Sequence, residues 1–376
     1  MKKVNAISLV ACGLLLSSSV AFGANTIDSA FKDGKVSGAL TAYATSTDNK
    51  DNNADSAFTS GAVSLAFETA DIKGFNAKAG FIGVHEFSEK NDNDASDIAS
   101  KSLMTEAYIK YTNDFFSLTA GRQAVDLEWM GDYHEAVVAA ITAVPDTTVV
   151  LGYTDKMAVA GVDEVSENFS GDFSGDGIKD DGAYVADIKY TGLKSVEFNP
   201  YAYSAPDIAN WYGLKTTFTA DMFGAVAHYA SSNEDVSGTA DGSMGALELN
   251  TTVSDFTAAI GYIKTDKDGG IGSMAAVGDN YVPFDSGDAI YLSDAKMTYG
   301  SLGYTIADVE LGALYGVTTY GTADFKEKEL NLTVGYSFTE SLATSLLFAN
   351  VDAAEADTTN NLVDRNYVLA SVEYTF

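Results

Sequence analysis

The sequence has one cysteine, four prolines and, beyond residue 23, no long apolar run. Cys12 lies in a segment that we expect to be removed on export, so the mature chain would have no disulfide to stabilise it. A membrane-spanning helix needs ~18 consecutive apolar residues, and no run after residue 23 approaches that length. These absences exclude a disulfide-stapled domain and a helical membrane protein.

Basic residues and histidines are also scarce. The chain has 22 Lys and Arg against 53 Asp and Glu, its formal charge is −31, and Arg122 and Arg365 are its only arginines. Nucleic-acid binding needs a basic surface, so the composition excludes it. The histidines, His85, His134 and His228, lack a metal-ligand spacing, and the chain has no nucleophile elbow or phosphate loop. We therefore predict that the chain is not an enzyme, and a Ser–His pair on a barrel rim stays an open alternative.

The N-terminus has the pattern of a secretory signal peptide. Lys2 and Lys3 precede an apolar stretch over residues 7–16, and Ala21-Phe22-Gly23 supplies the small residues of a cleavage site. We expect cleavage after Gly23, which makes residues 1–23 the signal peptide. A lipoprotein cleaved before Cys12 is the alternative, but the apolar run before Cys12 is short and continues through it.

The remainder of the chain alternates between apolar and polar residues. Hydrophobic residues make up 46% of the chain, with 20 Phe and 21 Tyr, and they are scattered rather than gathered in blocks. We expect residues 24–35 to form a periplasmic segment with a short capped helix or turn. From Val36 to Phe376, alternation over ~10-residue segments is typical of a membrane β-barrel.

Short and long connectors take turns along this region. Eight short connectors lie near residues 71–74, 112–114, 144–147, 191–194, 220–221, 254–255, 307–308 and 339–341. Nine longer connectors cover 47–60, 88–102, 124–134, 157–182, 205–209, 231–242, 265–294, 319–326 and 352–364. This rhythm predicts an all-β fold, an 18-stranded transmembrane antiparallel β-barrel with short periplasmic turns, long outer loops and both ends on one side.

Two segments fit the barrel less well. Residues 135–144 alternate poorly and could be helical, which leaves sixteen strands as the alternative. Pro200 falls in the middle of a strand, where it removes a ladder hydrogen bond, so we expect either a bulge there or a misplaced strand. A soluble propeller or sandwich would need strands richer in Val, Ile and Leu, and we disfavour it.

The alternation also assigns side chains to the two faces of the wall. We expect Phe75, Phe81, Leu332, Val368 and Phe376 to face lipid. The lumen should then carry Glu68, Glu86, Glu106, Asp187, Glu197, Glu248, Glu329 and Glu373 against Lys78, Lys110, Lys189 and Lys215. An excess of carboxylates lowers the potential in a pore and predicts a preference for cations. Salt bridges that merely hold the wall are the alternative role for these charges.

The connector at 124–134 is the candidate constriction. Its charged and aromatic residues, with their neighbours, are Arg122, Asp126, Glu128, Trp129, Asp132 and His134. A loop that folds into a barrel with charges of both signs creates a transverse field that orients polar solutes. Strict alternation turns Arg122 toward lipid, but its position at the end of a strand leaves the lumen equally open to it.

A second constellation resembles the opening of a calcium-binding loop. Asp172, Ser174 and Asp176 occupy positions 1, 3 and 5, Gly177 occupies position 6, and Asp180 follows. Position 12 is an alanine where a bidentate Glu is required. We therefore keep Ca²⁺ as a hypothesis beside a plain solvated acidic loop, and we predict no other cofactor.

The stretches Ala120-Gly121-Arg122-Gln123 and Asp126 to Tyr133 resemble the OprD-like and major outer-membrane porins of the epsilon group of proteobacteria. The segments 25–38 and 372–376 are similar to the same family, and elsewhere the likeness is architectural. The resemblance implies an 18-stranded channel that is often trimeric and whose third loop narrows the pore. With two arginines, the chain departs from the family's basic ladder, which puts a preference for basic amino acids in doubt.

Together these patterns predict a porin for passive diffusion of ions and small hydrophilic solutes. The expected partners are outer-membrane lipid, lipopolysaccharide, two further copies in a homotrimer, and the barrel-assembly machinery, which would read the terminal Phe376. The alternative function is a structural barrel or surface adhesin whose lumen is closed.

Overall fold

The computed structural model describes residues 24–50, 54–175, 177–277, 282–354, 357, 360 and 362–376. The predicted signal peptide lies outside the described residues. One helix, α1 (Ile27–Lys32), precedes the strands, and two 3₁₀ helices, η1 (Met274–Val277) and η2 (Ala289–Tyr291), lie in one connector. No helix in the described part of the chain is long and apolar enough to cross a membrane.

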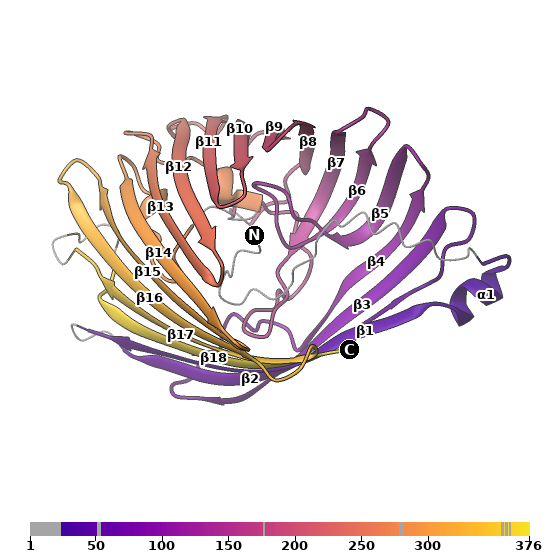
Figure 1. The fold of residues 1–376 in the computed structure, drawn as a ribbon, viewed down its shortest axis with the longest axis horizontal. Coiled ribbons are helices and arrows are strands. Elements are labelled where there is room, and N and C mark those ends of the chain that lie inside the picture. Colours follow the sequence, from indigo (N-terminus) through magenta and orange to yellow (C-terminus); the bar gives the residue numbers. More distant parts are fainter. Residues whose placement is uncertain are drawn as a thin grey trace.

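Eighteen strands make up the rest of the fold (Figure 1). They are β1 (Lys35–Asn49), β2 (Ser56–Glu68), β3 (Phe75–Glu89), β4 (Ser102–Thr112), β5 (Phe116–Ala124), β6 (Tyr133–Ile141), β7 (Thr147–Ala158), β8 (Ala183–Leu193), β9 (Val196–Ala205), β10 (Ala209–Thr219), β11 (Phe223–Glu234), β12 (Gly242–Val253), β13 (Phe256–Thr265), β14 (Lys296–Ile306), β15 (Val309–Tyr320), β16 (Phe325–Ser337), β17 (Leu342–Asp352) and β18 (Arg365–Thr375).

The sheet closes on itself. Each strand pairs antiparallel with its neighbours in the chain, and β1 pairs with β18 in a register that places Ala39 opposite Thr375. Closure removes the unpaired edges that an open sheet would expose. The prediction of eighteen strands is confirmed, and the sixteen-stranded alternative is wrong, because the doubtful segment forms β6 and pairs on both sides.

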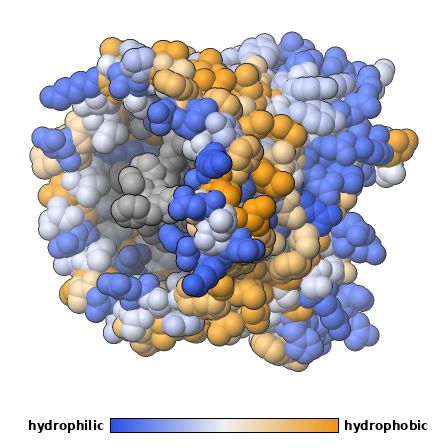
Figure 2. All heavy atoms as spheres, turned by 90° about the vertical axis from the view of Figure 1, so that its right-hand side faces the viewer, coloured by the Kyte–Doolittle hydropathy of each residue, from blue (hydrophilic) through white to orange (hydrophobic). Residues whose placement is uncertain are grey.

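The outer face of the barrel is apolar because alternate side chains point outward. On β16, Leu332, Val334 and Tyr336 are exposed, whereas Glu329 and Asn331 are buried on the other face. The predicted outward positions on β3 and β18 are exposed in the same way. Figure 2 shows hydrophobic residues gathered over the outer surface beside a hollow bordered by hydrophilic residues. This arrangement is typical of a barrel with an apolar environment outside and water inside.

Connectors at the end that carries both termini are short. Non-glycine residues with positive φ support several of these turns, among them Asp146, Ser195, Ser254 and Ala307. The connectors at the opposite end are named loops 1 to 9 in chain order. They cover residues 50–55, 90–101, 125–132, 159–182, 206–208, 235–241, 266–295, 321–324 and 353–364. Loops 5 and 8 are as short as the turns, and loop 1 is no longer than the turn at 69–74, so the predicted contrast in length holds for the other loops but not for these three.

Pro200 lies within β9 without the predicted bulge. It faces outward and stays in register with Leu214 of β10. On its other side the nearest recorded register shift lies between Tyr190 and Leu193, away from the proline. The side chain of Asn199 donates to the carbonyl oxygen of Ile188 at 3.0 Å. This side-chain bond satisfies a backbone acceptor beside the proline, so the expectation of a bulge at Pro200 is wrong.

The two ends of the barrel chain are fastened to each other. In α1, Thr26 and Ser29 form a reciprocal capping box, as the sequence predicts for a capped helix. The terminal residue, Phe376, exchanges two backbone hydrogen bonds of 3.0 Å with Gly38 at the start of β1. Its ring stacks beside Tyr374 on the outer face. The C-terminus therefore completes the β1–β18 seam.

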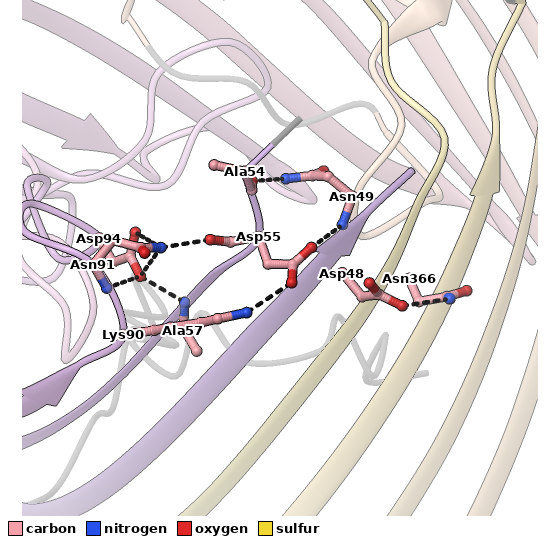
Figure 3. Close-up of polar contacts among 9 residues, drawn as sticks. All are labelled: Asp48, Asn49, Ala54, Asp55, Ala57, Lys90, Asn91, Asp94 and Asn366. Carbon is pink, nitrogen blue, oxygen red and sulfur yellow. Dashed lines mark hydrogen bonds and ion pairs between the residues drawn. The ribbon is translucent and has the colours of Figure 1, made fainter. Parts of the chain in front are cut away.

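Polar contacts join loops 1 and 2 at the other end of β1, β2 and β3 (Figure 3). Lys90 forms an ion pair of 2.7 Å with Asp55, and Asn91 donates to the backbone oxygen of Asp55 at 2.6 Å. The hydrogen bond from Lys90 lowers the pKa of the Asp55 carboxyl. Asp94 in turn accepts from the backbone N–H of Ala57. These contacts are exposed or only partly buried, and they fix the shape of the rim rather than a site.

Candidate functional site

Loop 3 folds into the lumen and is fastened there by Trp129. The indole is fully buried, and its Nε1–H donates to the hydroxyl of Tyr201 at 2.7 Å. Tyr201 lies on the inner face of β9, since the alternating residues Pro200 and Ala202 are exposed. Having accepted from Trp129, the Tyr201 hydroxyl can donate to Nε2 of His228, which is 2.7 Å away. The relay therefore ties loop 3 to β9 and β11.

A charged pair lies beside this relay. Both carboxylate oxygens of Glu128 are 2.8 Å from Nζ of Lys215 on β10, and Oε1 lies 3.7 Å from Nδ1 of His228. The Glu128 side chain is 8% exposed and that of Lys215 is 27% exposed. Bonds from an ionised donor to a carboxylate are stronger than neutral ones, so this pair is a second anchor of loop 3. The sequence predicted both residues at the pore but not their contact.

Loop 7 also folds into the part of the lumen that loop 3 occupies. The backbone N–H of Gly131 in loop 3 donates to the carbonyl oxygen of Val277 in η1. Ser273 accepts a hydrogen bond from the indole of Trp211 on β10 and donates to Glu234 of β11. Loops 3 and 7 and the inner faces of the nearby strands share one apolar cluster inside the barrel. Loop 7 therefore lies inside the barrel together with loop 3, where the sequence predicted loop 3 alone.

Loop 4 reaches a different part of the inner wall. It leaves β7, and the carbonyl oxygen of Val162 accepts from the buried hydroxyl of Ser60 on β2 at 2.6 Å. Ser60 faces inward, because Val63 and Leu65 of the opposite parity are exposed. Asp163 lies within reach of the Tyr43 hydroxyl on β1, and burial raises the pKa of the Asp163 carboxyl. Loop 4 therefore spans the lumen between β7 and the β1–β2 wall.

The predicted constriction residues divide between strands and loop. Arg122 belongs to β5 and His134 to β6, so loop 3 is confined to 125–132. His134 is fully buried, and its ring nitrogens contact the Thr154 hydroxyl and the Gly131 carbonyl oxygen. It supports the loop from the wall and does not face the pore. Asp126 and Asp132 are exposed in loop 3.

Arg122 is occupied by protein contacts. Its parity is that of the exposed residues Phe116 and Leu118, and its guanidinium bonds Glu135 at 2.9 Å. The guanidinium also packs 4.3 Å from the ring centre of Phe169 in loop 4. The Arg122 guanidinium therefore holds the ends of β5 and β6 to loop 4. These contacts do not support a role for Arg122 as a free charge in the pore.

Gly121, next to Arg122, has a backbone that other residues adopt poorly. Its φ is +126°, and a Cβ there would lie 2.2 Å from the carbonyl oxygen of Ala107. We expect Gly121→Ala to destabilise the barrel by about 1–3 kcal/mol, because both the positive φ and the clash must be relieved. Denaturant-induced unfolding of the detergent-solubilised protein measures the effect. The folded and unfolded fractions are read from the change in gel mobility that heating causes.

Gly245 offers the matched control. It lies on the outer face of β12, and a Cβ there meets nothing within 4 Å. Gly245→Ala should leave the free energy of unfolding within error of the native chain. Equal destabilisation by the two substitutions would contradict the strain assigned to Gly121.

The predicted lumen charges face inward, and several are paired there. Lys78 lies 2.8 Å from Glu106, and Glu248 accepts from the Tyr299 hydroxyl at 2.7 Å. Asp187 is 1% exposed and accepts from Asn199, so it does not meet pore water. The remaining predicted lysines, Lys110 on β4 and Lys189 on β8, are at least partly exposed on the inward parity of their strands.

The predicted calcium ligands are engaged in turn hydrogen bonds. Asp172 accepts from the backbone N–H groups of Gly175 and Gly177, and Asp180 accepts from those of Phe173 and Ser174. Asp176 lies outside the described residues. In the described part of the chain no three acidic, histidine or cysteine residues gather as a metal site. The observed contacts therefore explain the acidic pattern without an ion.

Sequence reasoning missed the inward paths of loops 4 and 7. Their lengths are the signal that could have found them, because long connectors in a compact domain are commonly functional. Glu327, Glu329 and Arg365 are among the partners of loop 7 on the wall. Of these three, only Glu329 was predicted to face inward.

Comparison with known proteins adds a family and a fold. A family model described as "Putative outer membrane protein" matches residues 26–222, more than half of the chain. Among solved structures, OccAB1 of Acinetobacter baumannii is 12% identical with a TM-score of 0.79, covering 92% of this chain and 97% of that one. OpdO of Pseudomonas aeruginosa is 14% identical with a TM-score of 0.76, covering 93% and 98%. OpdQ of the same organism is 16% identical with a TM-score of 0.75, covering 93% and 99%.

A search of the curated proteins gave no match. At such low identities the structural likeness is one of fold, and the family match carries the location of the chain in the outer membrane. Family and fold agree with the prediction that the chain is not an enzyme. The bacterial group named by the resemblance stays a prediction. The chain belongs to the family of outer membrane proteins described by that model, and it has the fold of the OprD and Occ porins.

Proposed function

We propose that the protein is a channel for passive diffusion of ions and small hydrophilic solutes across the outer membrane. The observation that carries this proposal is the access of inward charges to solvent. The side chains of Lys78 and Lys215 are 21% and 27% exposed although both face the interior of a closed barrel. Burying an ion without water costs several kcal/mol, so these side chains favour a water-filled lumen over a closed one.

Three loops would set the size limit. Loop 3 is fastened to β9, β10 and β11, loop 7 contacts loop 3, and loop 4 reaches β1 and β2. Asp126, Glu128 and Asp132 supply the negative charges of loop 3. Lys110 and Lys189 supply cations on the wall from β4 to β8, whereas Glu248 and Glu373 lie on β12 and β18. Opposed charges of this kind orient polar solutes during passage.

The preference for cations is a finer proposal. Of the eight predicted lumen carboxylates, Asp187 and Glu329 are buried by protein, which leaves six against the four lysines. The acidic excess of the chain and of its loops acts in the same direction. A negative potential at the mouth of the pore raises the local concentration of cations.

Planar-bilayer recording tests the channel itself. Purified protein should give stable open steps, and liposomes containing it should swell in sugars and amino acids up to a size limit. Silence in the bilayer, together with no swelling, would refute the channel and favour the structural barrel or adhesin.

Reversal potentials in a salt gradient test the selectivity. The native channel should prefer cations, and Glu106→Gln with Glu248→Gln should weaken that preference, because two inward carboxylates are lost. Asp308→Asn with Glu340→Gln removes the same charge from two turns and is the matched control. A native preference for anions would exclude this proposal.

Four further proposals concern processing and partners. We propose that residues 1–23 are a cleaved signal peptide, that three copies assemble, that Phe376 is read by the barrel-assembly machinery, and that lipopolysaccharide contacts the outer surface. N-terminal sequencing tests the first, and cross-linking of the protein in native membranes tests the second. Deleting Phe376 should reduce assembled protein if the third holds, and phosphate analysis of purified protein tests the fourth.

Calcium at Asp172, Ser174, Asp176 and Asp180 also stays a proposal. The turn hydrogen bonds of Asp172 and Asp180 would have to coexist with ion coordination. Calorimetric titration with Ca²⁺ should show saturable heat that Asp172→Asn removes, and absence of heat in the native chain would end the hypothesis.

A further inference from the structure

Loop 7 is docked on the wall through a set of buried carboxyl groups. Oε1 of Glu329 accepts from the backbone N–H groups of Asp285 and Ser286 at 3.3 and 3.1 Å. Oε1 of Glu327 accepts from the backbone N–H of Ala289 at 3.3 Å, and Asp285 accepts from Asn331 at 2.6 Å. Three side chains of β16 therefore hold one short segment of loop 7.

The contact is close and dry. Glu327 and Glu329 are 2% and 1% exposed. A Cβ at Gly287 would lie 2.5 Å from Oε2 of Glu329 and 2.6 Å from Oε1 of Glu327, so the loop backbone is pressed against both carboxyl groups. Oε2 of each glutamate and Oδ1 of Asn331 are buried without a hydrogen-bond partner in the described structure. Ionised oxygens in such a position are costly.

Positive charge at the contact is insufficient to balance the acids. Arg365 of β18 is the cation there, and its Nε donates to the Ser286 hydroxyl at 2.9 Å while Nη2 bonds the Ser286 carbonyl. The titratable and charged groups that face this contact in the described structure are Asp285 and Asp288 of loop 7, Glu327 and Glu329 of β16, Tyr320 of β15, Asp357 of loop 9 and Arg365. Five carboxyl groups thus share one guanidinium.

We propose that residues 284–292 of loop 7 form a proton-responsive gate, which docks on β16 and β18 only while Asp285, Glu327 and Glu329 are not all ionised, so that rising pH releases this segment into the lumen. Adjacent buried carboxylates cannot all carry charge in a low-dielectric contact. Releasing the loop exposes them to water, where each ionises freely. Protons therefore favour the docked state, and docking is strongest in acid.

The pKa of the loop residue Asp285 supports docking in acid and release at higher pH. Burial raises the pKa of Asp285 from 3.8 to about 6. A group whose pKa is higher in the docked state stabilises docking fully below its undocked pKa, and this contribution is lost as pH rises through the docked value. The window is therefore 3.8 to about 6. As the pH rises across this window, Asp285 alone would lower the equilibrium constant for docking by roughly a hundredfold.

The test combines two readouts on the full-length protein in detergent and in bilayers. Hydrogen exchange of residues 284–292, with labelling times scaled to the intrinsic exchange rate, should show protection in acid that is lost above the window. Bilayer currents should show a steady level in acid and frequent transitions at higher pH. Glu327→Gln with Glu329→Gln keeps the acceptors for the loop backbone without charge, so this variant should stay docked to higher pH and retain only the pH dependence that Asp285 contributes.

Controls separate the gate from general effects. Glu373→Gln removes an inward carboxyl that bonds Thr41 and does not contact loop 7, so it should keep the native pH dependence. Asp285→Asn serves if the double variant fails to fold, and it should remove its roughly hundredfold share of the pH effect. The electrical readout rests on the proposed channel, whereas the exchange readout does not, so failure of the two proposals can be told apart.

Three results would overturn the gate. Exchange of residues 284–292 that does not change with pH in the native chain is the first. The second is a Glu327→Gln, Glu329→Gln variant with the native pH dependence. Protection that Ca²⁺ restores at high pH would be the third, because a bound cation would then balance the carboxylates in place of protons.

Discussion

Trp129→Ala is expected to release loop 3 from the lumen wall and to destabilise the protein by about 3–5 kcal/mol, the range for removing a buried aromatic side chain. The indole is fully buried and donates its N–H to Tyr201. Its loss leaves a cavity among residues that otherwise share one cluster inside the barrel. The current should become noisy and, on average, larger, since loop 3 would no longer be held in one position. Single-channel recording and denaturant unfolding measure the two effects.

Two variants tell whether the effect belongs to loop 3. Tyr201→Phe removes the acceptor of the indole N–H but keeps the packing, so it should destabilise by about 1–3 kcal/mol with less added noise. Trp211→Ala removes an equally buried indole that bonds Ser273 of loop 7, so it should destabilise the protein without freeing loop 3. A Trp129→Ala channel with native current and noise would show that loop 3 does not limit the pore.

The sequence predicted the wall of this barrel well because the wall obeys a local rule. Side chains alternate between two solvents, and a one-residue slip would place every apolar residue of a strand in the lumen. Phe81 and Val368 are outward for this reason, and Glu106 and Glu248 are inward. The rule relates each residue only to neighbours two positions away, so the sequence alone shows which face of the wall a residue lies on.

The interior was harder to predict because its contacts join residues far apart in the chain. Trp129 meets Tyr201 across 72 positions, and Arg365 meets Ser286 across 79. Alternation turned Arg122 toward lipid and its place at a strand end left the lumen equally open, whereas in the structure its guanidinium contacts Glu135 and Phe169. Alternation states which face a residue is on, whereas the path of a loop depends on where its side chains find partners.

The spacing of acidic residues in the sequence likewise did not predict their contacts. The spacing of Asp172 and Asp180 suggested an ion, and in the structure these carboxylates accept backbone N–H groups of their own loop. Asp and Asn commonly stabilise turns in this way. Glu327 and Glu329 gave no local sign of their contacts, although they hold loop 7. A carboxylate pattern by itself does not distinguish a turn, an ion site and a docking contact.

Shortening loop 4 is expected to open the channel more than any single substitution, since this loop spans the lumen from β7 to β2. Met157 and Ser170 form an antiparallel bridge with both backbone hydrogen bonds at 2.8 Å, so the chain between them already leaves and returns at one point. Replacing residues 159–168 with Asn-Gly should close a tight hairpin there while keeping Phe169. Liposome swelling should then extend to larger solutes, and the conductance should rise.

The cost of this change falls on the contacts that the loop makes elsewhere. Val165 is fully buried and its backbone bonds Asp97 and Ser100 of loop 2, so loop 2 should exchange hydrogen faster in the shortened protein. Ser60 loses its contact with Val162, and Tyr43 loses Asp163 but keeps Tyr367; both gain water, because the removed segment leaves their inner faces open. Deleting residues 237–239 from loop 6, where the side chains are exposed, is the matched control and should change neither conductance nor size limit. A shortened loop 4 with the native size limit would mean that loops 3 and 7 narrow the pore without it.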